Sequence, residues 1–103
     1  MFLADVIGSV VTPVQIPDLE GRKQLLVRPV TPAGEPTARV RVALDELGAG
    51  PGDRVLVMDE GNSGRQLLGL PDAGCRGIVR AVVVGIVDAI DLESEVVYDH
   101  RTA

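Results

Sequence analysis

Two glycine-rich loops bracket one short apolar segment in the middle of this chain. The loops span residues 48–53 (GAGPGD) and 61–65 (GNSGR), and the segment between them is Arg54–Asp59. Pro51 and Gly52 occupy the second and third positions of a four-residue turn, where a type II turn requires a fixed negative φ and then a positive φ. A segment this short between two chain reversals is predicted to be a β-strand.

The composition favours the same class for the whole chain. Among 103 residues, 46% are hydrophobic, yet there is one Phe, one Tyr and no Trp. The core must therefore consist of Val, Leu, Ile and Ala. Such a composition, together with 12 Gly and 7 Pro, suits short strands joined by tight turns. We predict an all-β domain.

Four further segments are predicted to be strands: Phe2–Val11, Lys23–Val30, Arg39–Leu44 and Ile78–Ile90. Gly8 is expected to introduce a bend or bulge into the first of them. Residues Thr31–Thr37 carry Pro and Gly where a hairpin loop needs them. In the third strand, alternation places Val40, Val42 and Leu44 on one half-buried face.

One short helix completes the predicted domain. Asn62 or Ser63 is expected to cap it, because either side chain accepts from free helix N–H groups, and it would continue to Leu68. Five strands and one short helix predict a small, OB-like five-stranded β-barrel. The barrel is expected over residues 1–92, followed by a C-terminal tail at residues 93–103.

The last strong segment is apolar on both faces. A strand of this kind must be covered on both sides. One face can fill the barrel interior, and one short helix does not suffice for the other. We therefore predict oligomerisation, with Val82, Val84 and Ile86, or their alternates, packed across the subunit interface. Asp88, at the end of the strand, could pair with an arginine of a neighbouring subunit.

Charge and hydropathy exclude several partners. The net charge is −5, and a nearly aromatic-free acidic domain lacks the basic footprint and the stacking platforms of nucleic-acid binders. Such a domain is also repelled by anionic membranes. The longest apolar run, Ala81–Val87, is far shorter than the ~20 residues of a membrane-spanning helix. Residues 1–6 lack a basic n-region and read as a strand, so a cytoplasmic protein is expected.

The chain is poor in groups that perform chemistry, and we predict no enzymatic activity and no cofactor or metal. Cys75 is the single cysteine, and no positioned histidine accompanies it. His100 lies in the tail, where a short strand is expected at Val96–Tyr98. The glycines of 48–53 precede a strand, whereas a dinucleotide-binding motif opens a helix. The alternatives are an OB-like module that binds a small molecule or peptide, and a small enzyme with a cleft.

Four segments together resemble the EutN/CcmL family of bacterial microcompartment vertex proteins. They are residues 6–11, 19–29, 43–57 and 81–88, in the same order and at similar spacing. The resemblance implies a structural β-barrel that assembles as a cyclic homopentamer. Such pentamers close the corners of polyhedral shells of carboxysome or metabolosome type in the bacterial cytoplasm, beside hexameric or pseudohexameric shell proteins.

The vertex role assigns two candidate surfaces. Gly61, Asn62 and Ser63 are expected at the rim of the five-fold axis, where small residues permit close approach. Arg39 and Arg41 are expected to face away from the core and to meet acidic edges of neighbouring shell tiles.

Overall fold

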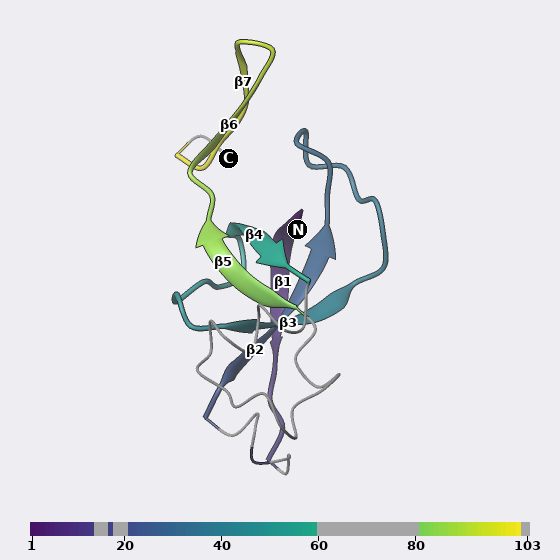
Figure 1. Ribbon diagram of the computed structural model, residues 1–103, viewed down its shortest axis with the longest axis vertical. Coiled ribbons are helices and arrows are strands. Elements are labelled where there is room, and N and C mark those ends of the chain that lie inside the picture. The colour runs from purple at the N-terminus through teal and green to yellow at the C-terminus, as the bar shows by residue number, and fades with distance from the viewer. Residues whose placement is uncertain (14–16, 18–20, 60–80, 102–103) are drawn as a thin grey trace.

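The computed structural model describes residues 1–13, 17, 21–59 and 81–101, in which every regular element is a β-strand (Figure 1). The strands are β1 (Phe2–Val10), β2 (Lys23–Pro29), β3 (Arg41–Asp45), β4 (Arg54–Met58), β5 (Val82–Ile86), β6 (Ala89–Leu92) and β7 (Glu95–Asp99). Five of them close a barrel in the order β1-β2-β3-β5-β4, and β6 and β7 form a separate hairpin. The predicted five-stranded barrel is confirmed. In these residues no helix is long and apolar enough to cross a membrane.

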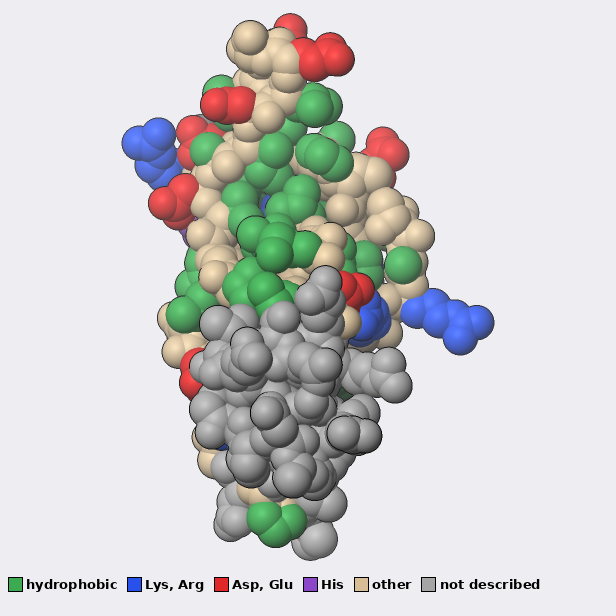
Figure 2. All heavy atoms as spheres, viewed as in Figure 1, with side chains coloured by type: hydrophobic (Ala, Val, Ile, Leu, Met, Phe, Trp, Pro, Cys, Tyr) green, Lys and Arg blue, Asp and Glu red, His purple; other side chains and the backbone are tan. Residues whose placement is uncertain are grey.

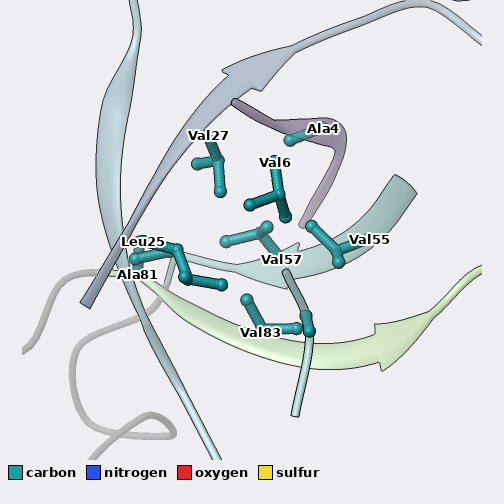
Figure 3. Packing of buried hydrophobic residues seen from close by; sticks show 10 residues of the cluster. Ala4, Val6, Leu25, Val27, Val55, Val57, Ala81 and Val83 are labelled. Atoms are coloured by element: carbon teal, nitrogen blue, oxygen red, sulfur yellow. The ribbon is translucent and has the colours of Figure 1, made fainter. Parts of the chain in front are cut away.

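Small aliphatic side chains fill the barrel interior, as the composition requires. These side chains come from all five strands and converge in the interior (Figure 3). The buried cluster consists of Ala4, Val6, Leu25, Val27, Ala43, Ala49, Val55, Val57, Ala81 and Val83. These side chains fill the interior, as is typical of barrels with few strands.

The turns and the first irregularity follow the sequence closely. The pairing of β1 with β2 shifts register between Val6 and Gly8, so the expected bulge is present. The loop after β2 closes through a hydrogen bond from the Thr31 N–H to the Glu35 carbonyl. At the turn before β4, Gly52 has a φ of +93° and the Asp53 N–H donates to the Gly50 carbonyl. This is the predicted type II turn.

The predicted orientation of β3 is wrong. Ala43 pairs with the core residue Leu25 and is fully buried, whereas Val42 is 46% exposed and Val40 is 44% exposed. Directly opposed residues share a face, so the pairing with β2 directs Ala43 inward. Leu44 is buried for another reason, because it lies at the seam where its N–H donates to the Ala81 carbonyl of the segment leading into β5.

The long apolar strand predicted up to Ile90 is interrupted. β5 ends at Ile86, and β6 begins a new two-stranded sheet with β7, which projects from the barrel (Figure 1). Glu93 and Ser94 form the turn with positive φ values of 52° and 69°. The strand expected at Val96–Tyr98 is present within β7. The division of the chain expected between residues 92 and 93 runs through the turn of this hairpin.

A buried carboxylate shapes the loop between β3 and β4. Asp45 is 2% exposed, and its carboxylate accepts hydrogen bonds from the N–H groups of Leu47, Gly48 and Ala49 at 3.1, 3.2 and 2.9 Å. Lys23 Nζ lies 3.8 Å from Asp45 Oδ2. These bonds hold the loop so that the Ala49 side chain completes the core.

We predict that Asp45→Ala lowers the free energy of unfolding by about 3 kcal/mol, because three backbone donors lose their partner. Urea denaturation followed by circular dichroism measures the change. Glu46→Ala is the matched control; Glu46 is exposed and pairs with Arg22 at the surface, so its loss should cost no more than about 1 kcal/mol. Equal destabilisation by the two variants would contradict a special role for Asp45.

Candidate functional site

The hairpin β6–β7 meets the barrel at a cluster built around Arg54. Arg54 lies opposite Asp5 of β1, and its Nε and Nη2 atoms donate to Asp5 Oδ1 and Oδ2 at 2.7 and 3.3 Å. The guanidinium carbon lies 4.1 Å from the centre of the Tyr98 ring in β7. One cation therefore binds β1 through a forked ion pair and the hairpin through a cation–π contact.

The cluster is closed to solvent on a third side by the loop between β2 and β3. Arg54 and Tyr98 are each only 9% exposed. A Cβ atom at Gly34 would lie 2.7 Å from Arg54 Nη2, so a larger residue here would displace the end of the Arg54 side chain. Gly34 also has a φ of +93°, a region that other residues rarely adopt.

His100 fastens the end of the hairpin. Its Nδ1 atom lies 2.9 Å from the Tyr98 hydroxyl, and its Nε2 atom lies 3.7 Å from Asp53 Oδ1. Its backbone N–H donates to the Asp88 carbonyl at 2.8 Å, which ties the residue after β7 to the residue before β6. A pocket at this base is lined by Asp88, Ala89, Asp99, His100 and Arg101.

The electrostatics of the cluster around Arg54 favour a neutral phenol at Tyr98. Burial raises the pKa of Tyr98, the Arg54 cation opposes the rise, and the carboxylates nearby add to it. The hydroxyl group therefore keeps its proton at physiological pH and remains a hydrogen-bonding partner for His100. The polar atoms of this cluster are directed at other parts of the same chain, so the arrangement positions the hairpin.

A second ionic cluster lies where β1 and β3 begin. The N-terminal amine lies 3.1 Å from Asp59 Oδ1, and Arg41 Nη1 lies 3.6 Å from Asp59 Oδ2. The hydrogen bond from the amine, with the charges of the amine and of Arg41, holds the pKa of Asp59 below its ordinary value. The Arg41 guanidinium also lies over the Phe2 ring at 4.7 Å.

The expectation that Arg41 faces away from the core is therefore wrong. Arg41 is two residues from the inward-facing Ala43 and shares its face of β3. Arg39 precedes the strand and is exposed, as expected.

The proposed interface strand does not present an unbroken outward row. Its register with β4 shifts, so that Val82 lies opposite Met58, Ile86 lies opposite the core residue Val55, and Val84 is unpaired. One inserted residue exchanges the two faces of the strand beyond it. Val82 and Ile86 therefore point to opposite sides of the strand.

The four candidates for the subunit interface, Val82, Val84, Ile86 and Asp88, differ in how far they are buried. Val82 is 4% exposed and is covered within its own chain. Val84 is half-buried, Ile86 is 42% exposed and Asp88 is exposed. Only the last three have surface to offer to a partner.

Apolar side chains are also exposed on the hairpin. Figure 2 shows them continuing from the hairpin onto the visible face of the barrel. The large exposed apolar residues of the described chain are Met1, Ile7, Val11, Val40, Val42, Leu47, Ile86, Leu92 and Val96. Leu92 and Val96 are 51% and 63% exposed on the hairpin, whose contacts with the described part of the barrel lie at its base.

Several predicted residues fall outside the described part of the chain. These are the rim candidates Gly61, Asn62 and Ser63, the short helix to Leu68, and Cys75. Among the residues that are described, no group of three or more His, Cys, Asp or Glu side chains is arranged to hold a metal ion.

Sequence reasoning missed the cluster around Arg54. Asp5 lies inside an apolar strand, and Tyr98 and His100 lie in the segment that the sequence predicts to be a tail. A charge inside an apolar strand is itself a signal, because such residues are seldom buried unless they are paired. The partner could not be named, because Asp5 and Arg54 are 49 positions apart and meet only through strand pairing.

Comparisons with known proteins agree on one family. The family model described as "Ethanolamine utilisation protein EutN/carboxysome" matches residues 1–88. The carboxysome shell vertex protein CcmL of Synechocystis sp. is 39% identical, over 98% of this chain and 96% of its own length. The bacterial microcompartment shell vertex protein PduN of Salmonella typhimurium is 42% identical, over 87% of this chain and 98% of its own length.

Solved structures share the fold. CcmL of Gloeobacter violaceus superposes with a TM-score of 0.84 at 33% identity, over 98% of this chain and 99% of that one. The GrpN pentameric microcompartment shell protein of Rhodospirillum rubrum superposes with a TM-score of 0.73 at 36% identity, over 89% of this chain and 99% of that one.

We predict that Arg54→Lys loosens the hairpin while the barrel stays folded. Lysine keeps the charge but loses the forked bond to Asp5 and the planar contact with Tyr98. Amide hydrogens of β6 and β7 should exchange about tenfold faster, the factor that corresponds to about 1.4 kcal/mol. Arg101→Lys is the control, because the Arg101 side chain is 89% exposed. Unchanged exchange in Arg54→Lys would show that the hairpin does not depend on this contact.

Proposed function

The chain belongs to the EutN/CcmL family, and from this membership we propose that it is the pentameric vertex protein of a bacterial microcompartment shell. The observation that carries the proposal is the shared fold with GrpN, a pentameric shell protein, over 89% of this chain. The relatives named above are vertex proteins of carboxysomes and of other microcompartments. The protein acts in the shell, inside the bacterial cytoplasm, as a structural component.

The physical task of a vertex protein is to impose curvature. A layer of hexagonal tiles stays flat, and five-fold units at its corners allow it to close into a polyhedron. A cyclic pentamer needs a head-to-tail interface, in which one patch of each copy binds a different patch of the next copy and the ring closes after five. Hexameric or pseudohexameric shell proteins are the proposed neighbours of this pentamer.

The end of β5 is the proposed part of the subunit interface. Val84 is half-buried and sits at the bulge, Ile86 is exposed, and Asp88 follows as an exposed carboxylate. This sequence places apolar surface next to an acceptor for an arginine of the neighbouring copy. Val82 supports this segment from within its own chain.

Two further assignments complete the proposal. Arg39 is exposed and has no ion pair within the described part of the chain, so it is available to acidic edges of neighbouring tiles. Gly61, Asn62 and Ser63 are proposed for the rim of the five-fold axis, on the family resemblance and on their small size.

We predict that the purified chain has a solution mass of five times its 10.8 kDa. Native mass spectrometry and light scattering measure it directly. A discrete pentamer supports the vertex role, since five-fold rings are uncommon among small barrels. A clean monomer at high concentration would overturn the proposal.

We predict that Val84→Asp gives monomer or aggregate in place of pentamer, because a carboxylate would be buried without a partner at the interface. Size-exclusion chromatography with light scattering separates the species. Val11→Asp is the matched control, since Val11 is 87% exposed just after β1, and it should still form pentamers. A full-size ring formed by Val84→Asp would place the interface elsewhere.

A further inference from the structure

Beyond its base, the hairpin β6–β7 is not covered by any of the residues that the structure describes. β6 and β7 pair only with each other, and both faces of the hairpin carry exposed apolar residues, Leu92 on one and Val96 on the other. A two-stranded hairpin is at best marginally stable in water without a further packing surface. The cluster around Arg54 fastens its base, and the part beyond that base needs another cover.

The hairpin is also strongly acidic and lies beyond the family model. Asp91, Glu93 and Glu95 lie on it around the two apolar residues, and none of the three is in an ion pair within the described chain. The matched part of the family model ends at Asp88, directly before β6. The hairpin therefore lies beyond the part that the family model matches, although CcmL of Synechocystis sp. aligns over 98% of this chain.

A surface of complementary chemistry lies on the outside of the barrel. We call it the outer patch and define it as Leu26, Arg28, Val40 and Val42. Leu26 pairs with Val42, Arg28 lies two residues after Leu26, and Val40 lies two residues before Val42. Val40 and Val42 are exposed, and Arg28 is an exposed cation with no ion pair among the described residues. The patch is apolar and basic, whereas the hairpin is apolar and acidic.

We propose that the hairpin β6–β7 of each copy docks on the outer patch of the next copy and so supplies a second part of the ring interface. This inference rests on the proposed pentamer, and a second copy of this chain is the occupant it names. Two different patches on one chain, alike in apolar character and opposite in charge, are what a head-to-tail ring requires. The cluster around Arg54 holds the hairpin in the direction that reaches the neighbour.

Charge reversal tests the docking. The hairpin variant carries Glu93→Arg and Glu95→Arg, and the patch variant carries Arg28→Glu. Each should raise the concentration at which half of the pentamer dissociates by about tenfold or more, because like charges then face each other at all five junctions. The combined variant should return to within about threefold of the original value. Mass photometry over a dilution series measures this concentration.

Mixing gives an independent readout. The combined variant should form rings with its own copies but should be depleted from rings with the original chain, whose acidic hairpin meets Glu at position 28. Native mass spectrometry of an isotope-labelled mixture resolves the composition of each ring. Glu46→Arg is the control for an added positive charge; Glu46 lies at the end of β3 away from Val40, and this variant should mix freely.

The outcomes separate this inference from the proposed function. If the original chain is not pentameric, the vertex role fails. If it is pentameric and the reversals leave dissociation and mixing unchanged, or the combined variant does not recover, docking of the hairpin on the outer patch is overturned. Circular dichroism of each variant confirms that the barrel is folded.

Discussion

The ion pair between Arg54 and Asp5, with Tyr98 stacked on the cation, is the contact on which the arrangement of this molecule depends. It joins β1, β4 and β7, and the loop that carries Gly34 covers it. Removing one member of such an enclosed pair leaves the other charge without compensation, which is why these pairs are sensitive to substitution. The barrel would retain its aliphatic core without it, but the hairpin would lose its direction.

Direction matters because a vertex is defined by geometry. A ring closes after five copies only when each donor surface meets the acceptor surface of the next copy at a fixed angle. The cluster around Arg54 fixes the direction of the hairpin relative to the barrel. Asp45 fixes the conformation of the loop that places Ala49 in the core. At both Arg54 and Asp45, several backbone or side-chain partners fix the orientation of a charged group.

Much of the barrel could be predicted from the chain itself. The strands, the bulge at Gly8 and the turn at Gly52 follow from apolar segments and from glycine and proline chemistry, which act over a few residues. The orientation of β3 could not be predicted, because Val42 and Ala43 are both apolar and only pairing with Leu25 decides which faces inward. The bulge at Val84 was not predicted, because Gly85 beside it lies inside a continuous apolar segment, where only the pairing with β4 shows the shift in register.

The sequence by itself determined the fold class, the family and the chemistry of the core, because these depend on local composition and on the order of short motifs. The tertiary structure alone decided which residues meet. Asp5 and Arg54 are distant in the chain. Tyr98 contacts Arg54 because strand β5 ends at Ile86 and the chain then folds back as the hairpin β6–β7. Contacts between distant segments depend on strand order and register, and these are set by the packing of the whole barrel.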